Sequence, residues 1–115
     1  MIPGYGLLAF RDPFGIRPLV LGKRARGFVG SDWIVASESL VLESGGYELV
    51  RDIAPGEAVF IALDGQMTSK QCAKNPTLVP CSFEYVYLAR PDATIATRSV
   101  HQARVEAVAA ICNKV

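Results

Sequence analysis

Few side chains in this sequence belong to the types that carry out covalent or proton-transfer chemistry. The chain has one histidine, His101, and three cysteines, Cys72, Cys81 and Cys112. Their spacing gives no Ser-His-Asp or Cys-His arrangement, and neither a G-x-S-x-G nor an H-E-x-x-H motif is present. A glycine-rich phosphate loop is also missing from the sequence. Residue types alone therefore predict no complete active site, and we expect His101 to be structural or solvated.

The cysteines indicate a reducing compartment. Their number is odd, no two form a C-x-x-C pair, and a small secreted scaffold would be richer in cysteine. The first residues also lack the basic and apolar regions of a signal peptide. We therefore expect a cytoplasmic protein whose thiols pack as small hydrophobic groups.

Composition places the chain among globular proteins. Its 115 residues suit one domain; half are hydrophobic and a fifth are charged. Twelve basic residues against 11 acidic ones give a net charge of +1, so no broad electrostatic face is expected. No apolar run approaches the length of about 20 residues that a membrane-spanning helix needs. We expect neither nucleic acid nor membrane as a partner.

Apolar runs bounded by turn residues predict strands through most of the chain. The expected strands are residues 5–10, 18–21, 33–36, 49–53, 57–63 and 66–70. Gly22 is expected to end the second strand, before a basic loop at residues 23–27. Asp64-Gly65 is a strong hairpin signal because both residues tolerate a positive φ. Residues 54–56, Ala-Pro-Gly, predict another tight turn.

Two helices are predicted. Residues 37–46 suit a short helix that Ser37 caps and that ends where Gly45 supplies a positive φ. A longer helix begins where Ser99 and Gln102 form a capping box. Its apolar stripe consists of Val100, Ala103, Ala107, Val108 and Ile111.

A polar connector at residues 73–80 and an aromatic, strand-like run at residues 82–88 lie between the last strand and this helix. Antiparallel strands followed by one helix leave two interpretations open. Either the chain is a complete α+β domain whose last helix folds back on its sheet, or a sheet layer is followed by the beginning of another unit. The pattern alone favours neither.

Four runs of the sequence are distinctive. They are G-L-L-A-F-R-D-P-F-G-I-R-P-L-V-L-G (6–22), V-A-S-E-S (35–39), E-L-V-R-D-I-A-P-G-E-A (48–58) and P-C-S-F-E-Y-V-Y-L-A-R-P-D (80–92). In this order they resemble internal segments of the amidophosphoribosyltransferases, also called glutamine phosphoribosylpyrophosphate amidotransferases. The resemblance covers essentially the whole chain. Parts of the first two runs also occur in asparagine synthetase and related amidotransferases, whereas E-Y-V-Y-x-A-R-P-D is much more specific.

The resemblance implies an enzyme of two domains. In the family, an N-terminal-nucleophile (Ntn) glutaminase domain of αββα fold releases ammonia from glutamine. A phosphoribosyltransferase domain, which uses magnesium, adds that ammonia to phosphoribosyl pyrophosphate. The product is 5-phosphoribosylamine, in the first committed step of purine biosynthesis; purine nucleotides inhibit the enzyme, and members are homo-oligomers.

On this resemblance the chain has an α+β fold with mostly antiparallel strands. Residues 1–81 correspond to the later half of the glutaminase domain. Residues 82–115 correspond to the domain crossing and the first helix of the phosphoribosyltransferase domain.

The residues that carry the family's chemistry match no position here. The family's nucleophile is an N-terminal cysteine whose own amino group is the general base. Here residues 1 and 2 are Met and Ile, and no cysteine precedes Cys72. The family's glutamine-binding and oxyanion residues belong upstream of the match, and its phosphate-binding loop belongs downstream. We therefore expect a fragment that is inactive alone and has no catalytic or substrate-binding residue of its own.

A few residues are still implied as sites by the resemblance. In one branch of the family, the cysteine matching Cys81 is one of four thiolates that hold a [4Fe–4S] cluster, and a packed thiol is the alternative. Arg90, Asp92 and His101 match the crossing between the two domains and are tentative junction residues. A solvated linker and helix start is the alternative for these three.

Arg11, Asp12 and Arg17 lie around a Pro-Phe-Gly turn, where we expect a structural role. Asp12 in particular is placed to accept hydrogen bonds from backbone amides across the turn.

Two other classes of protein remain open. One is a stand-alone, non-catalytic α+β interaction module, and the other is a different Ntn-type glutamine amidotransferase. A module would be monomeric and fold cooperatively, whereas a fragment would expose apolar edges and aggregate.

Overall fold

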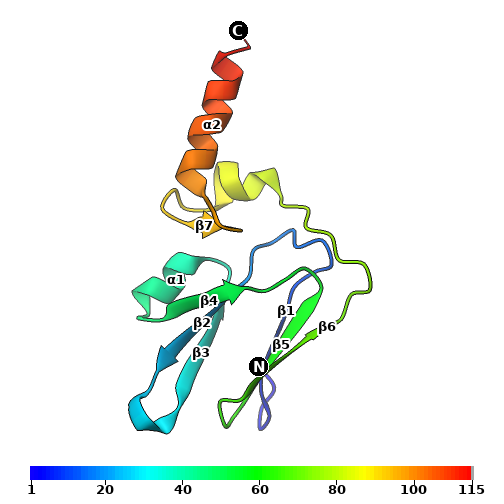
Figure 1. Cartoon of the computed structure of the whole chain (residues 1–115), viewed down its shortest axis with the longest axis vertical. Coiled ribbons are helices and arrows are strands. Elements are labelled where there is room, and N and C mark those ends of the chain that lie inside the picture. Colours follow the sequence, from blue (N-terminus) through cyan, green and yellow to red (C-terminus); the bar gives the residue numbers. More distant parts are fainter. Residues whose placement is uncertain (115) are drawn as a thin grey trace.

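Two three-stranded antiparallel sheets form most of the computed structural model, which describes residues 1–114 (Figure 1). The first has the order β1-β5-β6, with β1 (Gly6–Phe10), β5 (Glu57–Ala62) and β6 (Met67–Gln71). The second has the order β3-β2-β4, with β2 (Val20–Ala25), β3 (Ser31–Ala36) and β4 (Glu48–Asp52). The 3₁₀ helix η1 (Gly27–Val29) lies between β2 and β3, and α1 (Ser39–Ser44) follows β3. We call residues 1–81 the sheet unit.

The core of the sheet unit contains residues of both sheets. Its buried cluster consists of Leu21, Ile53, Val59 and Ile61. Partly buried residues of β1, β3 and β6 pack around this cluster. Alternate residues of β5 contribute because side chains along a strand point to opposite faces.

Helix α1 covers one face of the β3-β2-β4 sheet. Its buried Leu42 packs where Gly22 leaves room, since a Cβ at Gly22 would lie 2.4 Å from Leu42 Cδ2. On the β1-β5-β6 sheet, Leu8 and Phe10 are 42% and 72% exposed. Within the described residues, the outer face of that sheet has no covering layer.

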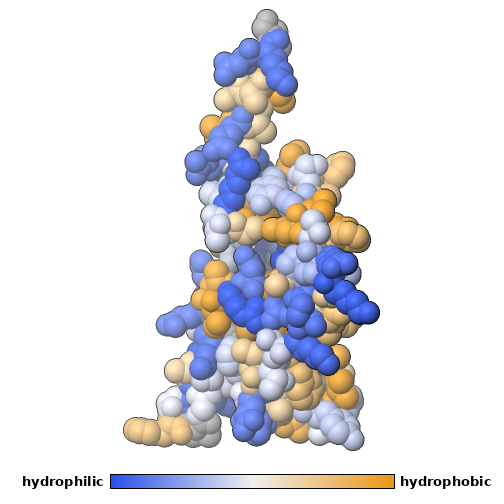
Figure 2. All heavy atoms as spheres, turned by 45° about the vertical axis from the view of Figure 1, so that its right-hand side comes forward, coloured by the Kyte–Doolittle hydropathy of each residue, from blue (hydrophilic) through white to orange (hydrophobic). Residues whose placement is uncertain are grey.

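Residues 82–114, which we call the helical unit, pack around a second and smaller cluster. Its elements are the π-helix η2 (Glu84–Leu88), β7 (Thr94–Ile95), β8 (Arg98–Ser99) and α2 (Val100–Cys112). The buried residues are Ala89, Ala93, Ile95 and Val100. In Figure 1, α2 points away from both sheets. Figure 2 shows apolar surface near the base of α2. In the segment before α2, Phe83, Val86 and Tyr87 are exposed.

The expected fold class is confirmed, since mostly antiparallel strands precede a C-terminal helix. Helix α2 starts as predicted, with Ser99 Oγ accepting a hydrogen bond from the Gln102 amide at 3.4 Å. Its main contacts are with η2 and β8 of the helical unit. Of the predicted stripe, Val100 is buried and Ala103 half-buried, whereas the other members are exposed: Ala107, Val108 and Ile111.

The predicted β5–β6 hairpin is also confirmed. The Ala62 amide donates to the Gln66 carbonyl at 2.9 Å, which encloses a three-residue loop. Only Gly65 in this loop has a positive φ, +83°, while the Asp64 carboxylate accepts from the Gln66 amide at 3.0 Å. The two residues of the signal therefore serve the turn differently.

The predicted end of the second strand is wrong. Strand β2 continues through Gly22 to Ala25 because it pairs with β3 on one side and β4 on the other. Lys23 and Arg24 consequently belong to the strand, and the loop begins at Arg26.

The predicted ends of α1 are also wrong. The helix starts at Ser39, and no side chain caps it. Gly46, not Gly45, has the positive φ, +71°. The Tyr47 amide donates to the Leu42 carbonyl at 2.8 Å, which is the Schellman pattern one residue later than expected.

The strand-like run at residues 82–88 is helical. The Ala89 amide donates to the Glu84 carbonyl at 2.9 Å, the spacing of a π-helix. Periodicity cannot separate strand from helix in so short an apolar run. Burial of Glu84 and packing of Tyr85 on the helical cluster accompany the helical form.

Candidate functional site

Arg11 and Asp12 organise the loop between β1 and β2. The Arg11 guanidinium donates to three backbone carbonyls, those of Arg17 (2.9 Å), Ile53 (2.7 Å) and Gly15 (2.9 Å). The Asp12 carboxylate accepts from the amides of Phe14 and Ile16, at 3.0 Å each. The structural role that the sequence predicted for Arg11 and Asp12 is confirmed.

A buried carboxylate lies at the start of β5. Glu57 accepts two hydrogen bonds from Arg51 on β4, at 2.8 and 2.6 Å, and one from the Ala54 amide at 2.8 Å. The hydrogen bonds from Arg51 hold the pKa of Glu57 below its ordinary value, against the opposing effect of burial. Because β4 and β5 belong to different sheets, this pair links the sheets; sequence analysis had not singled it out.

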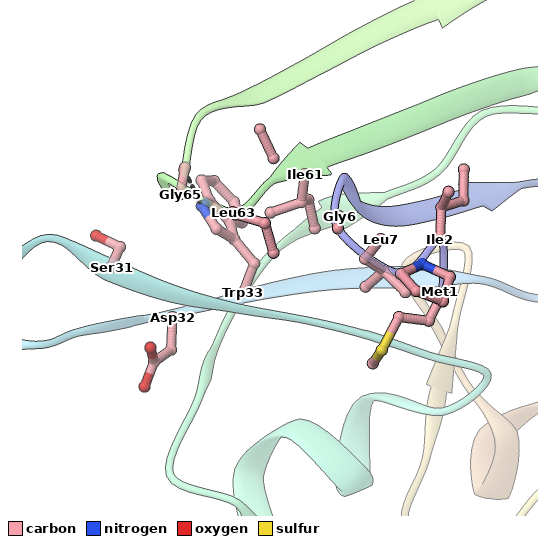
Figure 3. A pocket seen from close by; sticks show the side chains of 13 residues that line it. Met1, Ile2, Gly6, Leu7, Ser31, Asp32, Trp33, Ile61, Leu63 and Gly65 are labelled. Carbon is pink, nitrogen blue, oxygen red and sulfur yellow. Dashed lines mark hydrogen bonds between the residues drawn. The ribbon is translucent and has the colours of Figure 1, made fainter.

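A cavity of about 380 Å³ opens at one end of the sheet unit (Figure 3). Trp33 comes to it from β3 and Ile61 from β5, while Met1 and Ile2 border it from the N-terminal turn. The lining is mostly apolar and contains no histidine, cysteine or lysine. The cavity can accommodate an apolar group.

Two polar side chains at this cavity are already engaged. The Trp33 indole N–H donates to the Gly65 carbonyl at 3.0 Å, as the dashed line in Figure 3 shows. The Asp32 carboxylate points away from the cavity and pairs with Arg24 at 3.1 Å. The Asp32 carboxylate is therefore not positioned to act as a general base in the cavity.

The contact between the two units contains a buried charge that sequence analysis missed. Glu84 is 4% exposed, and its Oε1 lies 2.9 Å from Arg17 Nη1. On the other side of η2, Arg104 of α2 donates to the carbonyls of Tyr85 (2.7 Å) and Ala89 (2.8 Å). The signal was present, because a single acidic residue within F-E-Y-V-Y-L needs a partner if the segment is buried.

Two of the predicted junction residues lie together on the surface. Arg90 donates to both carboxylate oxygens of Asp92, at 3.1 and 2.9 Å, which lowers the pKa of Asp92. Arg90 also borders a shallow pocket with Glu38 and Leu40 of the sheet unit. The His101 side chain is exposed, and only its backbone amide reaches this segment, donating to the Pro91 carbonyl at 3.1 Å.

The cysteines do not form a metal centre among the described residues. Cys81, the last residue of the sheet unit, is half-buried, whereas Cys72 and Cys112 are exposed. Residues 1–114 contain no group of three or more His, Cys, Asp or Glu side chains that could hold a metal ion. A [4Fe–4S] cluster needs more thiolates than Cys81 supplies, so these residues by themselves do not fit one.

Over the same residues, no helix has both the length and the apolar character needed to cross a membrane.

Comparison with known sequences gives one consistent result. No family model matches the chain. It is 58% identical over 105 residues to the amidophosphoribosyltransferase of Haemophilus influenzae, covering 91% of this chain and 21% of that protein. The amidophosphoribosyltransferase of Pseudomonas aeruginosa is 46% identical over all 115 residues, which are 23% of its length. The chain thus spans about a fifth of the curated relatives that it matches.

Solved structures agree. The glutamine phosphoribosylpyrophosphate amidotransferase of Bacillus subtilis, complexed with ADP and GMP, matches 81% of this chain and 19% of its own with a TM-score of 0.71 and 36% identity. A structure described as the allosteric regulatory enzyme of purine biosynthesis matches 84% of this chain and 20% of its own, with a TM-score of 0.74 and 35% identity. These matches do not favour a stand-alone module or a different amidotransferase.

Proposed function

We propose that this chain, which belongs to the amidophosphoribosyltransferase family, is part of an enzyme that makes 5-phosphoribosylamine for purine biosynthesis. The substrates of that enzyme are phosphoribosyl pyrophosphate and the ammonia released from glutamine. The observation that carries the proposal is the match to the amidophosphoribosyltransferase of P. aeruginosa, which extends over all 115 residues with 46% identity.

The two units are proposed to belong to the two domains of that enzyme. Residues 1–81 are the later half of the glutaminase domain, and residues 82–115 are the crossing and the first transferase helix. Support comes from the two separate buried clusters, of which one lies in each unit. Arg90, Asp92 and His101 then lie at the domain junction. Of these, Arg90 borders the sheet unit at Glu38 and Leu40.

Cofactors and partners follow from the family. Magnesium serves the transferase domain through residues outside this chain. Cys81 is proposed as a single ligand of a [4Fe–4S] cluster whose other thiolates lie elsewhere in the enzyme. Purine nucleotides are proposed as feedback inhibitors, as the B. subtilis relative is complexed with ADP and GMP. The enzyme is proposed to be a cytoplasmic homo-oligomer.

Gene replacement in a purine auxotroph tests the proposal. The P. aeruginosa relative is suitable because it matches all 115 residues, so the whole chain can replace the corresponding segment. We expect the chimera to restore growth without purines in a strain that lacks its own enzyme, and the 115-residue chain alone not to restore it. A folded chimera that fails to complement, beside the unaltered relative that does, contradicts the proposal.

A further inference from the structure

The contact between the sheet unit and the helical unit depends on one buried carboxylate. Glu84 is 4% exposed and pairs with Arg17, whose side chain is 62% exposed. Within residues 1–114 this is the ion pair that joins the two units, since the others each lie inside one unit. As long as Glu84 stays buried, a shift that moves Arg17 away leaves the carboxylate without a partner, which is strongly unfavourable. The pair therefore favours the orientation that keeps Arg17 beside Glu84.

The sheet side of this pair is held firmly. The Arg17 carbonyl accepts a hydrogen bond from Arg11 Nε at 2.9 Å, and Arg11 Nη1 donates to the Ile53 carbonyl at 2.7 Å. Ile53 is fully buried in the core of the sheet unit. The position of Arg17 is therefore tied to that core.

The helical side is held equally well. Glu84 begins η2, and Arg104 of α2 donates to the carbonyls of Tyr85 and Ala89 in and after η2. A continuous path of polar contacts thus leads from Ile53 through Arg11, Arg17, Glu84 and Ala89 to Arg104 of α2. Among the partly buried hydrophobic residues that pack on the helical cluster, Leu40 of α1 comes from the sheet unit.

We propose that Glu84 is a positioning residue that fixes the orientation of the helical unit on the sheet unit through Arg17. The inference rests on the proposed function for its consequence in the enzyme. Ammonia released in one domain is used in the other, so loss of this orientation impairs the transfer of ammonia. Neither reaction by itself requires the contact.

The consequence is measured in the P. aeruginosa chimera with Glu84→Gln. We expect glutamine-dependent formation of phosphoribosylamine to fall about 10-fold, a size typical of coupling between sites. The rate of glutamate release and the rate of phosphoribosylamine formation with added ammonia should each stay within about 2-fold of the unsubstituted chimera. That change is much smaller than the expected fall in the glutamine-dependent rate. Glu106→Gln is the matched control, because Glu106 pairs with Arg98 inside the helical unit and is half exposed.

The orientation itself is measured in the 115-residue chain. Cys72 in the sheet unit and Cys112 in the helical unit are exposed, so spin labels at both, with Cys81→Ser, report the distance between the units. We expect Glu84→Gln to broaden the distance distribution. Arg17→Gln, which removes the charge of the exposed partner in the pair, should also broaden the distribution. Glu106→Gln should leave it unchanged.

The two measurements separate the two claims. A chimera without ammonia-dependent activity contradicts the proposed function, while the label distances still decide the role of Glu84. Unchanged distances in both variants overturn that role. Equal losses of the ammonia- and glutamine-dependent rates overturn it as well, because they indicate general damage.

Discussion

The sheet unit and the helical unit are stabilised in different ways. The sheet unit buries large apolar side chains from both sheets, and Leu21, Ile53 and Val59 are fully buried. The helical unit buries a smaller cluster that includes Ala89 and Ala93, and polar contacts to backbone carbonyls add to it. Because the free energy of burial scales with apolar area, the first unit has the stronger core. The helical unit depends more on individual polar contacts.

Truncation of core side chains gives the largest expected difference. Leu21→Ala should lower the free energy of unfolding by about 3 kcal/mol, since it leaves a cavity in the sheet core. Val100→Ala, in the helical cluster, removes fewer atoms and should cost about 2 kcal/mol. Urea titration of Trp33 fluorescence, which reports on the sheet unit, measures the first change, and helical circular dichroism measures the second. If either variant lowered the free energy of unfolding equally by Trp33 fluorescence and by circular dichroism, the separation of the two cores would be contradicted.

The two arginine–carboxylate pairs sharpen the same comparison. Glu57→Gln should destabilise the chain by about 1–2 kcal/mol, because it removes the buried charge and replaces one of the two oxygens that accept from Arg51 with an NH2 donor. Asp92→Asn, at an exposed pair in the helical unit, should not change stability measurably. Chemical denaturation at neutral pH compares them, and an equal loss in Asp92→Asn would show that burial is not the cause.

Acid provides an independent test of Glu57. Its pKa is lower in the folded chain than the value of about 4.3 in an unfolded one, so the unfolded chain binds the proton more readily. The stabilisation is therefore present above about pH 4.3 and is lost as the pH falls through the folded pKa. In Glu57→Gln this part of the acid sensitivity should disappear. An unaltered pH profile would assign the sensitivity to other groups.

The cap of α2 should have a smaller effect, confined to the helical unit. Ser99→Ala removes the hydroxyl that accepts from the Gln102 amide and should cost about 0.5–1 kcal/mol. Hydrogen exchange of the first-turn amides of α2 should quicken, with the sheet amides unaffected. Ser37→Ala is the control, since Ser37 precedes α1 without capping it; equal exchange in both variants would exclude the cap.

The smallest effect is a gain at the β7–β8 turn. Ala96 and Thr97 have positive φ, +47° and +66°, in a turn that favours Asn-Gly. Thr97→Gly should therefore stabilise the helical unit by about 0.5–1 kcal/mol. Thr68→Gly, in β6 with ordinary strand geometry, should destabilise the sheet unit instead. Thermal unfolding compares the two, and the same sign in both would refute the argument from backbone strain.

Sequence predicted the sheet unit better than the helical unit, for physical reasons. Turn residues such as Asp64-Gly65 and alternation along residues 57–63 are local signals, and the structure follows them. The continuation of β2 past Gly22 was missed because pairing on both sides comes from distant strands. In residues 82–88 the aromatic composition favoured a strand, while tertiary packing around Tyr85 favours a helix.

The site shows the same limit. The local contacts of Asp12 were predictable from its turn, whereas Arg17 meets Glu84 only after the 66 residues between them have folded. The Arg51–Glu57 pair was missed too, because it joins strands of different sheets across the Ala54-Pro55-Gly56 turn. Charge pairs that join different sheets or units can be identified only once the fold is known.

The most direct test of the account is the release of glutamate from glutamine. We propose that this chain supplies structure and that the catalytic groups lie in other segments of the enzyme. Glutamate release is to be measured for the purified 115-residue chain beside the P. aeruginosa chimera that contains it. We predict turnover by the chimera and only background hydrolysis by the chain. Turnover by the chain itself would contradict the account.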